Sequence, residues 1–253
     1  MFTPEQRAQL RADLLERAAS DKRISGAAIT GSAAAGREDR WSDIDLAFGV
    51  SDAAELPNVL SEWTSYMYDR HLAVHHCDVH SGAWIYRVFL LPVTLQVDLA
   101  FVPASEFRGL SPAFHLVCGT AQESRLVPPP PPESLIGLAW LYALHARSSI
   151  ARRKLWQAEH MISGVRDHAL ALACLRHGLP AAHGRGFDLL PDEVAARFEN
   201  SLVRQLDAAE LSRAFRIVVS GLLNEIEQVD VELARRLEEP LRHLCEAHAE
   251  APA

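Results

Sequence analysis

Five consecutive prolines, at positions 128 to 132, lie near the middle of this 253-residue chain. Proline lacks a backbone N–H and has a fixed φ, so such a run cannot continue inside a helix or pair at the centre of a sheet. It is expected to form an extended polyproline spacer of about 15 Å. The run therefore predicts a first domain at residues 1–127 and a second at residues 133–253, joined by a linker at residues 128–132.

The two parts differ in their hydrophobic patterns. Short apolar runs predict strands in the first part, whereas helix formers dominate the second. The expected strands are residues 24–30, 43–50, 71–80, 84–90 and 95–101, and the expected helices are an N-terminal one capped by Thr3 and residues 53–70, 133–149, 152–177, 193–206, 208–227 and 231–249. The sequence therefore predicts an α+β protein: a small mixed β-sheet flanked by helices in the N-terminal domain, and an all-α helical bundle in the C-terminal domain.

Two aspartates, Asp43 and Asp45, stand two residues apart at the start of an apolar run that ends at Val50. Side chains on a strand return to the same face every second residue, so both carboxylates are expected to point the same way. Neighbouring carboxylates repel each other unless a cation lies between them. Oxygen ligands of this kind suit Mg²⁺, which also takes up phosphate oxygens from its substrate.

A turn of small residues, Gly31-Ser32, follows the expected strand at residues 24–30. Glycine lets the backbone turn sharply and approach a ligand closely. Ser32 is expected to cap the helix-like stretch 33–35, whose free N–H groups suit phosphate, and to offer its hydroxyl to the same ligand.

A third acid, Asp98, is the only carboxylate in residues 84–102 and has apolar neighbours. A lone aspartate in a core-type strand is costly unless it is paired or bound to a metal. We therefore expect Asp98 to be a third metal ligand or a general base.

Together, Gly31-Ser32, a spacer, Asp43-Ile44-Asp45 and the later Asp98 resemble the motif of the nucleotidyltransferase superfamily that includes DNA polymerase beta. The spacer length and the segment LQVDLAF around Asp98 most resemble those of the aminoglycoside and lincosamide adenylyltransferases. The motif resemblance covers residues 24–102, and the similarity in layout extends through the helical half.

The resemblance implies an enzyme that moves AMP from ATP to a hydroxyl of a small molecule, such as an aminoglycoside-type antibiotic, and releases pyrophosphate. Asp43, Asp45 and Asp98 would hold Mg²⁺, with two ions expected, and Asp98 would also be a candidate to accept the proton of the acceptor. Gly31 and Ser32 would hold the β- and γ-phosphates of ATP.

Arg37 lies in the loop between these motifs. Because arginine pairs well with phosphate oxygens, it is a further candidate for nucleotide binding. Its charged neighbours suit an ordinary solvated loop equally well.

The expected helix at residues 152–177 carries a polar face apart from its apolar stripe, and Trp156, Glu159, Ser163 and Arg166 fall on it. Some aminoglycoside members have a catalytic base in the helical domain, a glutamate that Glu159 resembles in setting. Glu159 is therefore a candidate catalytic residue, and Trp156, Glu159 and Arg166 are candidates for acceptor binding. A solvated face with pairs along the helix explains the pattern equally well.

A histidine-rich run at residues 71–80 has ligand types that suit zinc. Strand alternation, however, would send His75 and Cys77 to one face and His76 and Asp78 to the other. A polar, partly exposed strand is the preferred interpretation.

The formal net charge is −8, and basic residues form only short clusters, whereas nucleic-acid binding needs a basic track. The lack of such a track predicts no nucleic-acid partner, and no apolar run is long enough to span a membrane. The resemblance implies a nucleoside triphosphate and a small-molecule acceptor as partners, and the chain could form a homodimer. Four widely spaced cysteines and an N-terminal segment without an apolar core predict a reduced, cytoplasmic protein. Trp41 and Trp84 are expected to be packing residues rather than platforms for a nucleobase.

Two other function classes remain open. A protein-modifying or antitoxin-type nucleotidyltransferase would act on a side chain of a partner protein, although such antitoxins are usually minimal single domains. A nucleotide-binding module without catalysis would bind ATP tightly and release no pyrophosphate.

Overall fold

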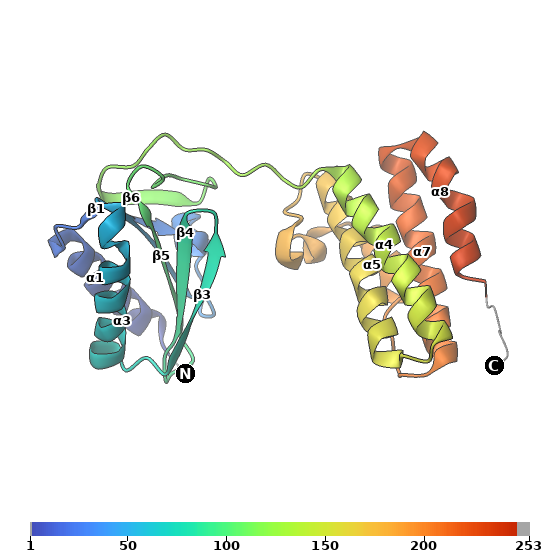
Figure 1. Cartoon of the computed structure of the whole chain (residues 1–253), viewed down its shortest axis with the longest axis horizontal. Helices are drawn as coiled ribbons and strands as arrows, with labels where there is room; N and C mark the ends of the chain where they lie inside the picture. The colour runs from blue at the N-terminus through green and yellow to red at the C-terminus, as the bar shows by residue number, and fades with distance from the viewer. Residues whose placement is uncertain (1, 247–253) are drawn as a thin grey trace. The chain divides into compact units, whose positions relative to one another are not determined.

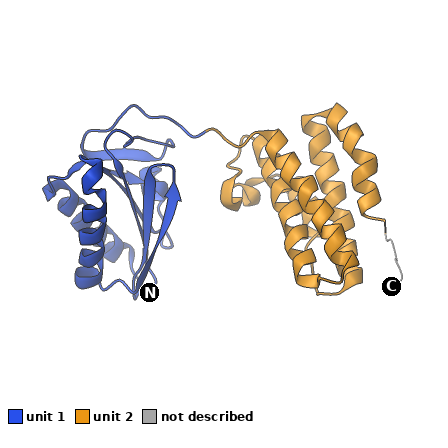
Figure 2. Ribbon diagram, in the orientation of Figure 1, with its two compact units in different colours: residues 1–127 blue, residues 128–253 orange. Residues whose placement is uncertain are grey.

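The chain consists of two compact units, residues 1–127 and residues 128–253 (Figure 2). The computed structural model describes residues 2–246. Each unit buries a large hydrophobic cluster of its own, one on the helix-covered face of a sheet and the other among helices.

A six-stranded sheet in the order β3-β4-β5-β2-β1-β6 forms the centre of the first unit (Figure 1). β2 and β5 pair in parallel, and the other neighbours pair antiparallel. The strands are β1 (Ile24–Thr30), β2 (Ile44–Val50), β3 (His75–Ser81), β4 (Trp84–Leu90), β5 (Gln96–Pro103) and β6 (Phe114–Gly119). The helices are α1 (Pro4–Ser20), the single turn α2 (Gly31–Ala34), the 3₁₀ turn η1 (Ala53–Glu55) and α3 (Leu56–His71). The mixed sheet with helices confirms the predicted α+β class.

Helices α1 and α3 cover one face of this sheet (Figure 1). The predicted capping box starts α1: the Thr3 side chain accepts the N–H of Gln6, and the Gln6 side chain accepts the N–H of Thr3. On α3, Trp63 packs against Phe48 of β2 and Phe101 of β5, with ring centroids 4.7 and 5.7 Å away. This aromatic cluster fastens the helical layer to the central strands.

Several boundaries differ from those predicted. β2 begins at Ile44, so Asp43 precedes the strand instead of opening it. Leu72 adopts a left-handed conformation after α3, and β3 therefore begins only at His75. β6 was not among the predicted strands, although Phe114, Leu116, Val117 and Cys118 form a short apolar run. Most of its side chains are exposed at the edge of the sheet.

The described part of the second unit contains α4 (Pro132–Ala151), α5 (Leu155–Arg176), α6 (Asp192–Glu199), α7 (Ala208–Val229) and α8 (Val231–Leu244), with 3₁₀ turns η2 (Ala182–Gly184) and η3 (Phe187–Leu189). α4 begins at Pro132, the last proline of the run. Proline suits the first helical position, because the N–H it lacks would have no partner within the helix. Within residues 2–246, the structure contains no helix with the length and apolar character that a membrane crossing requires.

The last two predicted helices also need correction. α6 ends at Glu199 rather than at residue 206, and Asp207 then caps α7 by accepting the N–H of Glu210. α8 continues through Pro240, where the sequence pattern predicted an interruption. Residues 247–249 of the predicted last helix lie outside the described residues.

Candidate functional site

Asp43, Asp45 and Asp98 lie together at one end of the sheet. β2 and β5 are parallel neighbours, and their register places Asp45 directly beside Asp98, while Asp43 immediately precedes β2. One carboxylate oxygen from each residue lies within 4.8 Å of the others. Within residues 2–246, this is the one group of three or more metal-ligating side chains. The structure thus brings together the three acids singled out from the sequence.

The acids project from the sheet face opposite α1 and α3. Along β2, Ile44 and Leu46 join the core beneath the helices, whereas Ala47 joins a smaller cluster on the other face. Residues two apart share a face, so Asp45 lies on the face of Ala47, and its register partner Asp98 lies there too. Strand alternation therefore keeps the carboxylates out of the main core.

Gly31 turns the chain beside Asp45. Its φ is +62°, a conformation that favours glycine. A Cβ atom at this position would collide with the carboxylate of Asp45. The sequence pattern explained this glycine by a close approach to a ligand, but the structure shows that it also makes room for one of the acids.

Ser32 lies inside the single turn of α2, so the prediction that it caps a helix is wrong. The turn begins at Gly31, and Thr30 occupies the cap position. The Ser32 hydroxyl oxygen is buried and has no hydrogen-bond partner among the described residues. Buried hydroxyls are normally hydrogen-bonded, so this one suits a ligand that offers an acceptor oxygen, such as a phosphate.

Gln96 connects two of the acids. Its side-chain amide donates to Asp98 Oδ1 at 2.9 Å and to Asp43 Oδ2 at 3.3 Å. Burial raises the pKa of Asp98 to about 6, against the lowering effect of the Gln96 hydrogen bond, and the charge of Asp43 adds to the rise. Gln96 was not among the predicted site residues, although strand alternation two residues before Asp98 could have indicated it.

Arg37 is exposed in the loop between the two motifs. Its backbone N–H donates to the carbonyl of Ser32 at 3.0 Å, which closes the turn after α2. Its role in nucleotide binding stays a prediction.

In the second unit, Ser163 connects Glu159 with Arg166. The Ser163 hydroxyl donates to Glu159 Oε1 at 2.7 Å, and the Arg166 guanidinium donates to Ser163 Oγ at 2.8 Å. Arg166 also donates to the carbonyl of Ser201 at 3.2 Å. Trp156, earlier on α5, is 77% exposed. The predicted polar face is therefore a hydrogen-bonded row within this unit, and its part in acceptor binding stays a prediction.

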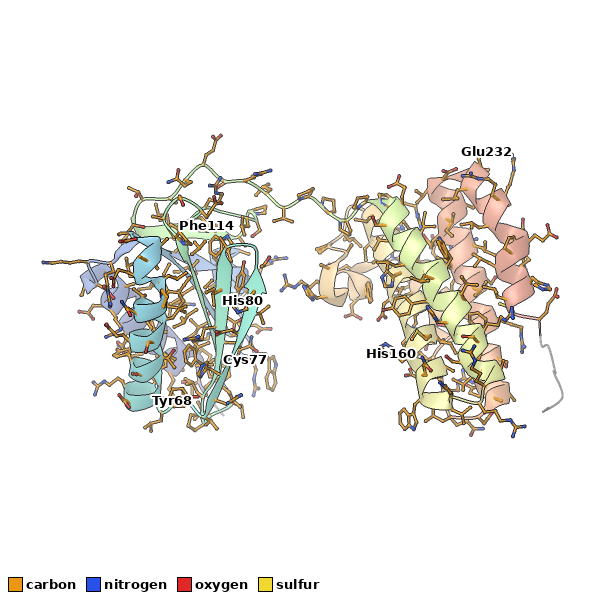
Figure 3. The ribbon with its side chains drawn as sticks, in the orientation of Figure 1. Tyr68, Cys77, His80, Phe114, His160 and Glu232 are labelled. Atoms are coloured by element: carbon orange, nitrogen blue, oxygen red, sulfur yellow. The ribbon has the colours of Figure 1, made fainter. Side chains whose placement is uncertain are left out.

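Residues 75–80 of the histidine-rich run lie in edge strand β3, where Figure 3 labels Cys77 and His80. His76 Nδ1 shares a hydrogen bond with the hydroxyl of Tyr68 on α3 at 3.0 Å, and Asp78 forms an ion pair with Arg87 at 2.6 Å. Six of the seven residues of β3 are exposed, which agrees with the polar-strand interpretation.

The two tryptophans considered from the sequence differ in burial. Trp84 is 8% exposed and belongs to the cluster on the acid-bearing face, as expected of a packing residue. Trp41 is 64% exposed, so the same prediction is wrong there. Its backbone N–H donates to the Asp39 carboxylate in a surface turn, and the Arg40 guanidinium lies 4.3 Å from its ring centroid.

No protein-family model matches this chain, and no curated protein matches its sequence. Among solved structures, an aminoglycoside 6-adenyltransferase from Bacillus subtilis is similar over 98% of this chain and 100% of its own, with 12% identity and a TM-score of 0.43. At this identity and TM-score, the likeness supports no conclusion about the activity of this chain.

Proposed function

We propose that this chain is a Mg²⁺-dependent nucleotidyltransferase that moves AMP from ATP to a hydroxyl of a small molecule, such as an aminoglycoside-type antibiotic. The observation that carries the proposal is the meeting of Asp43, Asp45 and Asp98 beside the Gly31-Ser32 turn. These residues are the ones whose order along the chain resembles the superfamily motif.

The residues present fit a divalent cation. Carboxylate oxygens within 4.8 Å of one another are the hard ligands that Mg²⁺ prefers. Burial and the charge of Asp43 disfavour the ionised form of Asp98 and raise its pKa, and a bound cation would favour that form again. Mg²⁺ held by the three acids, as two ions, would neutralise charge on the phosphates and on the leaving pyrophosphate.

The proposed reaction is an in-line displacement at the α-phosphorus of ATP. The acceptor oxygen forms a bond to this phosphorus, the bond to the oxygen of the β-phosphate breaks, and pyrophosphate leaves. Asp98 accepts the hydroxyl proton, with Glu159 as the alternative base, while the Ser32 hydroxyl and the turn at Gly31 hold the β- and γ-phosphates. Most of the rate then comes from positioning and charge neutralisation.

For the acceptor, we propose the polar row on α5. Glu159 binds a cationic group of the acceptor or takes up its proton, and the Ser163 bridge to Arg166 fixes the carboxylate for that role. Trp156 offers exposed apolar surface, and Arg37 contacts the triphosphate. The proposed partners are ATP and a small molecule in the cytoplasm, with no nucleic acid and no membrane.

A direct experiment tests transfer. The protein is incubated with ATP, Mg²⁺ and a panel of aminoglycosides and lincosamides, and mass spectrometry detects an acceptor that has gained AMP. We expect Asp43→Asn and Asp45→Asn to abolish the gain. Asp69→Asn is the matched control, because Asp69 is an exposed aspartate on α3.

The outcomes separate the function classes. Full transfer by Asp43→Asn would show that the acids are not the site. AMP transfer to a copurifying protein would replace the small-molecule acceptor with a protein one. Tight ATP binding without release of pyrophosphate from ATP, whichever acceptor is added, would indicate a nucleotide-binding module without catalysis.

A further inference from the structure

The loop that leads into Asp43 is a closed turn. The carboxylate of Asp39 accepts hydrogen bonds from the backbone N–H of Trp41 at 2.8 Å and from the hydroxyl of Ser42 at 3.0 Å. The Ser42 hydroxyl oxygen in turn accepts the N–H of Asp39 at 2.9 Å. The last part of the spacer between the two sequence motifs, residues 39–42, is therefore held together by its own side chains up to the residue before Asp43.

Arg7 of α1 donates hydrogen bonds to the backbone of this turn. Its Nη1 donates to the carbonyl of Asp39 at 2.6 Å and to the carbonyl of Ser42 at 2.8 Å. Its Nε lies 2.9 Å from Glu38 Oε1, and Arg11 also reaches that carboxylate at 2.6 Å. One guanidinium thus contacts the loop at three residues, the last of which adjoins Asp43.

Arg7 is only 4% exposed, although it carries a charge. A buried charge is costly unless it is paired and hydrogen-bonded, so the contacts of Arg7 must be kept for the guanidinium to stay buried. Because two of them are to backbone carbonyls of the loop, they fix the path of the main chain and not merely a neighbouring side chain. The planar fork of arginine suits such a fixed set of acceptors.

We infer that Arg7 is a positioning residue for Asp43, and that it sets the affinity of the three acids for a divalent cation. This inference rests on the proposed function, because it assigns Asp43 to the metal site. Displacement of the loop would move Asp43 relative to Asp45 and Asp98, which are held by the sheet register. Supporting contacts around metal ligands typically change metal affinity about 10–100-fold when they are removed.

Mn²⁺ binding to the purified full chain tests the inference, with the free ion measured by electron paramagnetic resonance. We expect Arg7→Met to raise the Kd for Mn²⁺ about tenfold or more and Arg7→Lys to recover part of the loss, because lysine keeps the charge but not the fork. Arg23→Met is the matched control: Arg23 ties Asp21 to Glu62 and precedes β1, at the strand end opposite Gly31. Its Kd should equal that of the wild type even where its thermal midpoint falls.

If Arg7→Met does not fold, the Mn²⁺ affinities of Arg7→Lys and Ser42→Ala test the inference instead. Ser42→Ala removes the hydroxyl that closes the turn and leaves no buried charge without a partner. We expect Ser42→Ala to raise the Kd severalfold. Wild-type Mn²⁺ affinity in folded Arg7→Met, or in both Arg7→Lys and Ser42→Ala, would overturn the positioning role while leaving the metal site intact. If the wild type binds no Mn²⁺, or if Asp43→Asn binds it as tightly as the wild type, the metal assignment itself is overturned, and this inference with it.

Discussion

The two faces of the sheet come from alternate residues of the same strands and have opposite characters. Toward α1 and α3, β2 presents Ile44, Leu46 and Phe48, each at most 1% exposed. Toward the other side it presents Asp45 and Ala47. Large side chains of β2 therefore fill one face, whereas the side chains of Asp45 and Ala47 on the other face are small. The main core and the acids therefore lie on separate faces, so truncating a core side chain of β2 should mainly change stability, and replacing Asp45 should mainly change the chemistry.

The acid-bearing face is itself divided along its length. At one end, the ring of Phe107 lies over Gly26 and Gly49, where a Cβ atom would collide with it. At the other end, Gly31 leaves space for the carboxylate of Asp45. Glycine thus admits a packing ring at one end and a polar group at the other.

The largest expected effect is on the acid-bearing face. Asp45→Asn should lower the rate of AMP transfer roughly a thousandfold or more, because a lost metal ligand removes several kcal/mol of transition-state stabilisation. Its urea midpoint should not fall. Pyrophosphate release measures the rate, with Asp69→Asn as the control, and an unchanged rate would break the assignment of chemistry to this face.

The packed face should show the reverse behaviour. Phe48→Ala removes a ring that contacts Trp63 and Phe101, and it should lower the free energy of unfolding by about 3–5 kcal/mol. Urea denaturation measures this loss. Val79→Ala, on the exposed edge strand β3, should stay within about 0.5 kcal/mol of the wild type, and a similar loss in both variants would contradict the contrast.

Substitutions at two glycines distinguish the effect of backbone strain from the effect of a collision with an acid. Gly31 and Gly36 have φ values of +62° and +65°, but only at Gly31 would a Cβ meet Asp45, whereas nothing lies within 4 Å at Gly36. Alanine should cost about 1–2 kcal/mol of stability at both positions. Only Gly31→Ala should also lower transfer activity and Mn²⁺ affinity, and equal activities would show that the space beside Asp45 is not needed.

The smallest expected effect is on how the free energy of unfolding of the metal-free protein depends on pH. Burial raises the pKa of Asp98 to about 6 from its ordinary value of 3.8, so the folded state holds this proton more tightly than the unfolded chain. Stability from this group is full below about pH 4 and is lost as the pH rises through about 6. Asp98→Asn should therefore be more stable than the wild type at pH 7, by about 1–2 kcal/mol after allowance for partial exposure.

Urea unfolding of both proteins in EDTA, from pH 4 to pH 8, measures this difference. The two stabilities should diverge between about pH 4 and pH 6. If the two curves of stability against pH run parallel across this range, the pKa of Asp98 is not raised by its surroundings.

Features that depend on neighbours along the chain were predictable from the sequence. Alternation indicated that Asp43 and Asp45 form a pair, the apolar run 84–90 matches β4, and the capping box at Thr3 starts α1 as predicted. These patterns reflect backbone periodicity and local hydrogen bonding, which act within a few residues.

Contacts between distant residues were not predictable in the same way. The Gln96 amide donates a hydrogen bond to Asp43, and Arg7 donates hydrogen bonds to the loop before Asp43. No local sequence pattern relates the residues that these contacts join. Trp41 was expected to pack because of its size, but the turn around Asp39 leaves it exposed. In each case the chain path between elements decides the outcome, and side-chain type alone does not encode that path.

The sequence predicted the two-part organisation, the α+β class and a common role for the three acids, because proline chemistry, periodicity and the cost of burying charge are local properties. Only the tertiary structure decided that Asp45 and Asp98 are register partners, that Gly31 clears space for one of them, and that Arg7 holds the approach to Asp43. The physical reason is that parallel pairing and close packing select one alignment of distant segments, and that alignment brings separated carboxylates to one end of the sheet.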